Sequence, residues 1–259
     1  MPLSLCTWNI NSVRLREGLV ARLLREEAPD ILCLQETKSP VEKIPTEAFE
    51  ALGYRHRVAR GEKGYNGVAI LSRQPLEAME PHDFCGKGDA RHVAARHASG
   101  LVVHNLYVPA GGDEPDPGKN PKFDHKLRFV EEMAEAFAAA PGAQALVGDL
   151  NIAPGEEDVW SHKQLLKIVS HTPQEVERFE AAREAGGWSD AVRRHLPEGK
   201  LYSWWSYRSK DWALADKGRR LDHVWTTSPV ETRSARILKA ARGWEKPSDH
   251  APVFVEIAD

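Results

Sequence analysis

Cysteine is scarce in this sequence, and its scarcity limits the kinds of structural support that the chain can use. Only three cysteines occur among 259 residues, Cys6, Cys33 and Cys85, and they lack the paired spacing of a zinc site. An odd number of thiols without such spacing argues against a disulfide framework and against zinc as an organising metal. We expect reduced thiols with a structural role.

Long hydrophobic runs and an excess of one charge are also missing. No segment approaches the roughly 18 apolar residues of a membrane span, and the opening segment MPLSLCTWNI lacks the basic start and long apolar stretch of a secretion signal. The 35 basic and 38 acidic residues give a formal charge of −3, so nucleic-acid binding would depend on a local basic face. No Gly/Ser/Pro-rich linker divides the chain. We therefore expect a cytoplasmic monomer with no membrane partner, folded as one domain over residues 1–259.

Strand and helix patterns alternate along the first half of the chain. Apolar runs predict strands over residues 3–8 and 30–36, and leucines between them recur at helical spacing before Pro29 (Leu15, Leu19, Leu23 and Leu24). Further short strands are predicted over residues 54–60, 66–72, 91–98 and 101–108. Ser99 and Gly100 form a hairpin signal between the last two, and the set predicts an antiparallel meander.

The second half continues this alternation and decides the expected architecture. Helices are predicted over residues 122–140 and 172–186, the second beginning with a Thr cap followed by Pro. Strands are predicted over residues 200–207, 220–227 and 251–257. Mixed strands with interposed helices favour an α/β fold, a four-layered α/β sandwich in which two packed mixed β-sheets are flanked by helices. The similar segments LCTWNINS and LVGDLNIAP suggest two related halves.

Polar side chains stand within or at the ends of many of these apolar strands. Burying an ionised carboxylate costs several kcal/mol or more unless a cation or hydrogen bonds compensate. Each such residue alone could be a helix cap or a turn residue, but together they predict one shared site. The set consists of Asn9, Asn11, Gln35, Glu36, Tyr107, Asp149, Asn151, Asp222, His223, Asp249 and His250.

The chemistry of this set favours a hard cation. Carboxylate and amide oxygens without a thiolate suit Mg²⁺ or Mn²⁺. The Asp-His pairs at residues 222–223 and 249–250 provide carboxylates that could orient an imidazole. The chain has neither a Gly-x-Ser-x-Gly segment nor a P-loop, which argues against a serine hydrolase and a P-loop NTPase. Metal-assisted hydrolysis of a phosphoester fits best.

Seven segments between Trp8 and Pro252 carry a resemblance to a known family. They are WNINSVR, LQETK, GYNGVAILS, NLYVPAG, GDLNIAP, RRLDHVW and SDHAP. In this order they resemble the motifs of the exonuclease III family of abasic-site (AP) endonucleases, within the endonuclease/exonuclease/phosphatase superfamily. The resemblance implies a Mg²⁺- or Mn²⁺-dependent DNA repair nuclease. Such an enzyme hydrolyses the phosphodiester 5′ to abasic sites in duplex DNA and also acts at 3′ ends as an exonuclease and end-cleaning enzyme.

The resemblance also implies roles for the polar set. Asp149 activates the attacking water and Asn151 stabilises the transition state. His250, oriented by Asp222, contacts the scissile phosphate, and Tyr107 binds the phosphate or assists the leaving oxygen. The implied metal site comprises Asn9, Glu36, Asp149, Asn151, Asp249 and His250.

The segment YSWWSYR and several basic residues are candidates for contact with DNA. In the resembled family an aromatic here lines a pocket for the extruded abasic sugar, which makes Trp204 the first candidate and Trp205 the second; either could instead be a core residue. The basic candidates for a phosphate-tracking surface are Arg91, Arg208, Arg219 and Arg220, with Lys87, Lys119, Lys122 and Lys210 nearby in sequence.

Two other functions share part of this pattern. A superfamily phosphatase acting on an inositol phosphate or a phosphorylated lipid would use the same Glu, Asp-Asn and Asp-His chemistry but would not need the tryptophans with basic flanks. A DNA-binding module without catalysis would need no metal-binding carboxylates.

Overall fold

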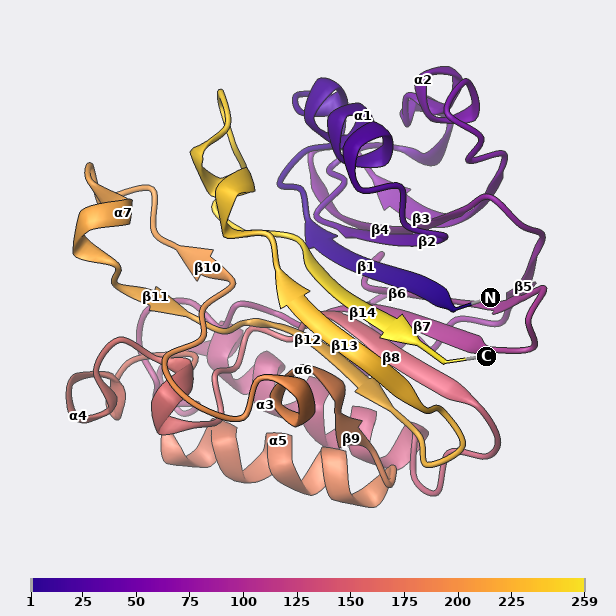
Figure 1. Cartoon of the computed structure of the whole chain (residues 1–259). Coiled ribbons are helices and arrows are strands. Elements are labelled where there is room, and N and C mark those ends of the chain that lie inside the picture. Colours follow the sequence, from indigo (N-terminus) through magenta and orange to yellow (C-terminus); the bar gives the residue numbers. More distant parts are fainter. Residues whose placement is uncertain (1, 259) are drawn as a thin grey trace.

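The two β-sheets pack face to face, and helices cover their outer sides (Figure 1). The computed structural model describes residues 2–258, and in this range each of these two sheets has six strands. The first contains, in spatial order, β13 (Thr232–Ile237), β14 (Val253–Ile257), β1 (Leu3–Asn9), β2 (Ile31–Gln35), β4 (Tyr65–Ser72) and β3 (His56–Glu62). The second contains β5 (Leu76–Met79), β6 (His92–His97), β7 (Val102–Tyr107), β8 (Gln144–Asp149), β12 (Asp222–Thr226) and β9 (Ser189–Asp190). The predicted α/β sandwich is confirmed.

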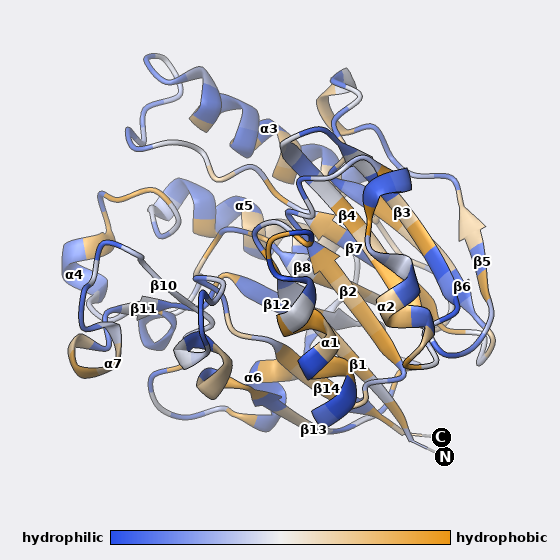
Figure 2. Ribbon diagram, turned by 90° about the horizontal axis from the view of Figure 1, so that it is seen from above, coloured by the Kyte–Doolittle hydropathy of each residue, from blue (hydrophilic) through white to orange (hydrophobic). Residues whose placement is uncertain are grey.

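The outer layers contain α1 (Glu17–Glu26) and α2 (Thr46–Glu50) on one side and α3 (Pro121–Ala136) and α5 (Pro173–Ala185) on the other. The short helix α6 (Ala191–His195) contributes to the core between the sheets, and α4 (His162–Leu165) and α7 (Trp212–Ala215) lie at the edge near β10 and β11 (Figure 1). Apolar side chains of α1 and α2 pack on the first sheet, and those of α3 and α5 pack on the second. Viewed from above, strands β1, β2 and β4 are mainly hydrophobic (Figure 2). None of the helices within residues 2–258 has the length and apolar character needed to span a bilayer.

Strand β2 shows why its apolar run is continuous. Ile31 and Cys33 face the core between the sheets, whereas Leu32 and Leu34 pack in the layer below α1 and α2. Side chains alternate between the two faces of a strand, so a strand covered on both faces needs apolar residues at every position.

The two sheets repeat one arrangement of strands. Strand β1 lies between antiparallel β14 and parallel β2, and β8 lies between antiparallel β12 and parallel β7. The similar segments in the sequence therefore occupy corresponding strands. Because the last residues of these strands are Asn9 and Asp149, the two sheets deliver their polar ends to corresponding positions.

Three details of the predicted elements are wrong. The strands expected to form one meander are divided between the sheets, with β3 and β4 in the first and β6 and β7 in the second. The strand predicted over residues 200–207 shortens to β10 (Trp204–Trp205), which pairs with β11 (Gly218–Arg219). Leu15 precedes α1 and is 65% exposed, so it does not belong to the buried helix face.

Two histidines of the second sheet form a hydrogen-bonded chain with their neighbours. The backbone N–H of His82 donates to His92 Nδ1 at 2.9 Å, so the proton of neutral His92 lies on Nε2, which faces His104 Nδ1 at 3.2 Å. His104 Nε2 then donates to Gln144 Oε1 at 3.0 Å. Burial lowers the pKa of His104 to about 4. In this hydrogen-bonded arrangement, every ring nitrogen of His92 and His104 has a partner only while both rings are neutral.

The hydrogen bonds of His92 and His104 predict how the stability of the protein depends on pH. Between pH 6.5 and pH 4 the unfolded chain binds a proton at His104 that the folded chain does not, so the free energy of unfolding falls as pH falls through this range. The loss due to His104 reaches up to about 3 kcal/mol near pH 4. His104→Gln keeps one acceptor and one donor, so urea denaturation at several pH values should show a shallower decline. An unchanged decline would contradict the neutral state.

Candidate active site

Strands from both sheets bring most of the predicted polar residues to one edge of the sandwich. Two members of the set lie elsewhere: Gln35 is bonded to Thr7 and Asn105 in the interior, and His223 is bonded to Arg220 and Ile152 O. Asp149 ends β8 and lies in register with Tyr107 on β7 and with Asp222 on β12. Asn9 ends β1 in the opposite sheet, and its side-chain amide donates to Asp149 Oδ2 at 2.8 Å. The buried carboxylate is therefore met by an amide from the other sheet.

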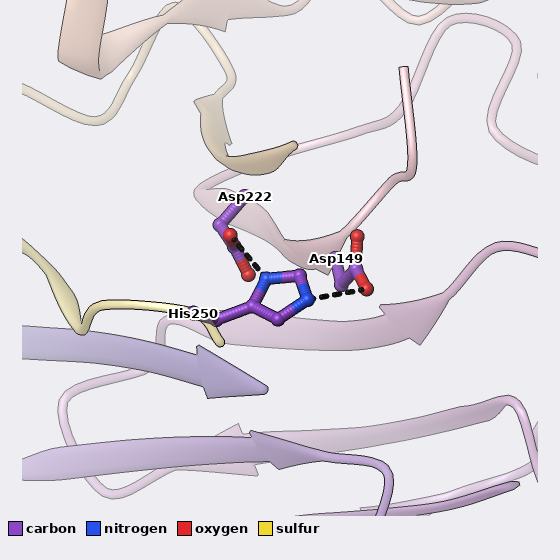
Figure 3. A group of neighbouring side chains, drawn as sticks. All are labelled: Asp149, Asp222 and His250. Atoms are coloured by element: carbon purple, nitrogen blue, oxygen red, sulfur yellow. Dashed lines mark hydrogen bonds and ion pairs between the residues drawn. The ribbon is translucent and has the colours of Figure 1, made fainter. Parts of the chain in front are cut away.

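A buried chain of two carboxylates and one imidazole forms the centre of the site (Figure 3). His250 Nδ1 lies 2.8 Å from Asp222 Oδ2, and its Nε2 lies 3.7 Å from Asp149 Oδ2. The exposed fractions of Asp149, Asp222 and His250 are 1%, 0% and 4%. Burial raises the pKa of Asp149 to about 7, although His250 partly opposes this rise. Burial alone would lower the pKa of His250, but Asp222 and Asp149 outweigh it and raise it to about 10. His250 is thus held as an imidazolium near neutral pH.

Ser203 orients Asp222, and this role was missed in the sequence. Its hydroxyl donates to Asp222 Oδ2 at 2.6 Å and accepts the backbone N–H groups of Leu221 and Asp222, each at 3.0 Å. Ser203 lies just before the two tryptophans of YSWWSYR, and a lone serine beside a strand has no signal of its own in the sequence. No spacing rule reveals a contact between residues 19 positions apart in the sequence.

Glu36 forms the acidic side of the site next to Asn9. Its Oε1 accepts from Asn9 Nδ2 at 2.9 Å, and its Oε2 pairs with Lys38 Nζ at 2.7 Å. Burial would raise the pKa of Glu36, but Lys38 outweighs it and the pKa is lowered, so this carboxylate is ionised. Asn9 therefore links the carboxylates of Glu36 and Asp149 through one amide nitrogen.

The donor atoms around Glu36 and Asp149 fit a hard divalent cation. Ionised carboxylates and amide oxygens are present, and no thiolate lies among the predicted ligands Asn9, Glu36, Asp149, Asn151, Asp249 and His250. Ligand atoms of Asp149, Asp222 and His250 also lie within 4.8 Å of one another. Since Asp222 Oδ2 is already bonded to Ser203 and His250, we regard Asp222 as the partner of the imidazole and not as a metal ligand.

Asn151 and Tyr107 border the two carboxylates. Asn151 has a left-handed backbone with φ 54°, its N–H donates to Asp149 Oδ1 at 3.0 Å, and its side chain donates to Val108 O at 2.9 Å. Burial and the neighbouring Glu36 raise the pKa of Tyr107 well above its ordinary value. The phenol is therefore neutral and can donate a proton.

A pocket of about 670 Å³ opens onto this centre and contains Trp204. Trp204 Nε1 donates to Asp249 Oδ2 at 2.9 Å, while Arg219 lies over the Trp204 ring at 5.3 Å. Trp204, Arg208 and Arg219 line the pocket together with Asp149 and His250. Trp204 is thus a pocket residue, and Asp249 is held at the rim by the indole.

A second pocket, of about 540 Å³, shares Glu36 and Tyr107 with the first. Its basic lining residues are Lys38, Lys87, Arg91 and Lys122. Arg91 pairs with Asp89 at 3.1 Å and lies over the Tyr107 ring at 4.8 Å. Lys119 is engaged on the surface by Glu114 and Asp116, and Lys210 does not line either pocket.

The structure corrects two of the predicted DNA contacts. Trp205 is 1% exposed and packs with Tyr202 and Ala251, which makes it a core residue. Arg220 is also 1% exposed, and its guanidinium is bonded to Asp158 and Asp190. The residues of YSWWSYR and RRLD alternate between faces, so in each neighbouring pair one side chain reaches the pocket and the other reaches the interior.

The fold and the site together define a metal-dependent phosphodiesterase. The site combines the ionised carboxylate of Glu36, an imidazolium held between two carboxylates and an open pocket at one edge of a two-sheet sandwich. The comparisons with known proteins define the group further. Residues 6–250 match the model of the Endonuclease/Exonuclease/phosphatase family. The exodeoxyribonuclease III of Haemophilus influenzae is 29% identical over 264 residues, which cover 96% of this chain and 98% of the relative.

Solved structures agree with the family match. An AP endonuclease from Archaeoglobus fulgidus superposes with a TM-score of 0.92 and is 32% identical, covering 99% of this chain and 100% of that structure. A 3′ phosphatase from Neisseria bound to product DNA hairpin gives a TM-score of 0.90 and 31% identity, with 99% and 100% coverage. The chain therefore belongs to the endonuclease/exonuclease/phosphatase family, and its predicted resemblance to the exonuclease III type of AP endonuclease is confirmed.

The contrast between Arg219 and Arg220 yields a testable prediction about stability. Arg220→Gln removes the buried cation that Asp158 and Asp190 share and leaves Asp158 with Arg193 alone, so we expect unfolding to become about 3 kcal/mol easier. Arg219→Gln removes a partly exposed guanidinium that bonds to Ser170 and should cost much less. Urea denaturation of the two variants measures the difference, and equal losses would contradict this assignment.

Proposed function

We propose that this chain is a Mg²⁺- or Mn²⁺-dependent DNA repair nuclease that hydrolyses the phosphodiester 5′ to abasic sites in duplex DNA. We also propose 3′-to-5′ exonuclease and 3′-end-cleaning activities, in line with the names of its relatives. The observation that carries the proposal is the buried Asp149–His250–Asp222 chain beside the acidic group of Glu36, at the floor of a pocket lined by Trp204 and Arg219.

The protonation states support hydrolysis of a phosphodiester. Asp149, with a pKa of about 7, can accept a proton from a water molecule as its oxygen forms a bond to phosphorus. His250 as an imidazolium can donate a hydrogen bond to a phosphate oxygen and offset the developing charge. The bond from phosphorus to the 3′ oxygen then breaks, and the neutral hydroxyl of Tyr107 is a candidate donor to this leaving oxygen.

Glu36 and Asn9 are our first candidates for holding the cation, with Asp149, Asn151, Asp249 and His250 as further candidates. When bound, the cation supplies Lewis-acid polarisation of the phosphate. Asn9 donates to Glu36 and Asp149 at the same time, so it keeps the acidic side and the proposed general base at a constant separation.

The walls of the pocket favour DNA over a small phosphorylated lipid or inositol. Trp204 offers an aromatic surface beside the site, which suits an extruded sugar that has lost its base. Arg208 and Arg219 lie in this pocket, while Arg91, Lys87 and Lys122 line the adjoining one. Cations on both sides of the proposed scissile phosphate suit a strand that continues in both directions.

The proposed function predicts metal-dependent incision at a single lesion. A duplex oligonucleotide with one abasic site should be cut 5′ to that site in Mg²⁺, with a 3′-hydroxyl product, and excess EDTA should abolish cutting until Mg²⁺ or Mn²⁺ is restored. Glu36→Gln should raise the Mg²⁺ concentration needed for half-maximal rate, since it removes one anionic oxygen donor.

The same assay separates the alternatives. Turnover of an inositol phosphate or a phosphorylated lipid, with the abasic duplex left intact, would identify a superfamily phosphatase. Tight binding of the duplex with no turnover of any phosphoester would identify a binding module. Full activity in excess EDTA would refute the proposed requirement for a divalent metal ion.

The assigned proton donors and acceptors predict the behaviour of two variants. Asp149→Asn and His250→Ala should each lower kcat by about 10²- to 10⁴-fold while the abasic duplex still binds. Asp149→Asn should also lower the melting temperature, because both carboxylate oxygens accept hydrogen bonds from Asn9 and Asn151 and an amide nitrogen cannot accept them. Single-turnover kinetics, gel-shift binding and thermal melting measure the three properties. Near wild-type turnover at saturating Mg²⁺ would refute the assigned roles.

A further inference from the structure

Lys126 and Glu175 form an ion pair that is completely buried near the candidate site. Lys126 lies on α3 and Glu175 on α5, both side chains are 0% exposed, and Lys126 Nζ lies 2.5 Å from Glu175 Oε1. Replacing such a pair by apolar residues is often neutral or stabilising, so the energy of the ion pair does not explain it. Glu175 also forms the capping box of α5 with Thr172, which accounts for the glutamate but not for the buried lysine.

The lysine end of this pair holds the turn that carries Asn151. Lys126 Nζ donates to Asn151 O at 2.7 Å and lies 3.4 Å from Ala110 O. A left-handed φ of 54° at Asn151 costs free energy that surrounding contacts must offset, and Lys126 supplies such a contact at the carbonyl. Asn151 in turn donates its backbone N–H to Asp149 Oδ1.

The lysine also packs closely against the loop shared by the two pockets. Gly111 has a φ of 88° and lines the second pocket, the one with Lys38, Lys87, Arg91 and Lys122. A Cβ added to this glycine would lie 2.8 Å from Lys126 Cδ. The space around the lysine side chain is therefore filled, and the ammonium has little freedom to leave Asn151 O.

The glutamate end holds the Ser170 loop, which also lines the site pocket. Its carboxylate accepts the backbone N–H groups of Ser170, at 2.9 Å, and Thr172, at 3.1 Å, as well as the Thr172 hydroxyl. The Ser170 hydroxyl accepts from Arg219 at 2.7 Å, and Arg219 lies over Trp204. One buried ion pair thus contacts both the Asn151 turn and the loop that anchors the Arg219–Trp204 wall.

We propose that Lys126 and Glu175 are positioning residues, which hold the Asp149–Asn151 turn and the Ser170 loop at a set distance from each other. This inference rests on the proposed function for its catalytic consequence. It does not assign either residue a contact with DNA or with the reacting atoms. One sign of the buried lysine is present in the sequence, because Lys126 falls on the apolar face of α3 between Phe123 and Val130.

The test uses variants that separate position from folding. Lys126→Met leaves the Glu175 carboxylate unpaired and should lower the melting temperature. The double variant Lys126→Met/Glu175→Gln buries no charge, so its melting temperature should return towards that of the wild type. If the pair positions the turn, the double variant should still show kcat reduced by roughly 10- to 100-fold on abasic duplex, with KM nearly unchanged.

A matched pair on the same two helices is the control. Arg178 and Glu131 join α5 to α3 at 2.6 Å with side chains 32% and 49% exposed. Arg178→Met/Glu131→Gln should leave kcat, KM and melting temperature close to those of the wild type. A Lys126/Glu175 double variant with wild-type kcat and wild-type stability would overturn the inference.

Hydrogen exchange tests the positioning without relying on activity. The amides of Leu150, Asn151 and Ala153 are bonded to Leu221 O, Asp149 Oδ1 and Ser170 O, so a loosened turn should exchange faster. We expect faster exchange over residues 150–153 in the Lys126/Glu175 double variant than in the control pair variant. Exchange equal to that of the control would overturn the inference, whereas a wild-type protein that cuts no DNA would refute only the proposed function.

Discussion

The buried carboxylate of Asp149 is the constraint on which the site depends. An ionised group so far from water is tolerated only when dipoles and opposite charges surround it. Asn9 from the other sheet, the Asn151 amides and the His250 imidazolium provide them. Asp222 and Ser203 are needed in turn to hold that imidazolium. The face-to-face packing of the two sheets therefore also brings together the charges that a phosphodiesterase needs.

Two further groups of ion pairs are buried close to the site. Each one contacts a residue near the end of a strand that carries site residues. Arg220 joins Asp158 and Asp190 two residues before Asp222, and Lys126 joins Glu175 below Asn151. The hydrogen bonds within these ion pairs have preferred distances and directions. Strand ends held in this way can keep catalytic groups within the narrow geometric range that hydrolysis requires.

The fold alone allows several chemistries, since one family includes nucleases and phosphatases. The surroundings of the site therefore bear on which chemistry this chain performs. An indole and arginines line one pocket, and the adjoining pocket carries lysines and Arg91. The relatives named above include a 3′ phosphatase bound to product DNA hairpin and an AP endonuclease.

The sequence by itself determined the three longest helices, α1, α3 and α5, many of the strands and the polar residues at the strand ends, because periodicity and residue type are local properties of the chain. The short helices and the strands β5, β9, β11 and β13 were not predicted. The sequence also determined the family, through seven motifs in order. Only the tertiary structure decided which strands share a sheet and which member of each adjacent pair faces the pocket, as Trp204 and Arg219 do while Trp205 and Arg220 do not. Ser203 and Lys126 were found only in three dimensions for the same physical reason. Their contacts join segments that are far apart in sequence, and the packing of sheets and helices alone brings them within hydrogen-bonding distance.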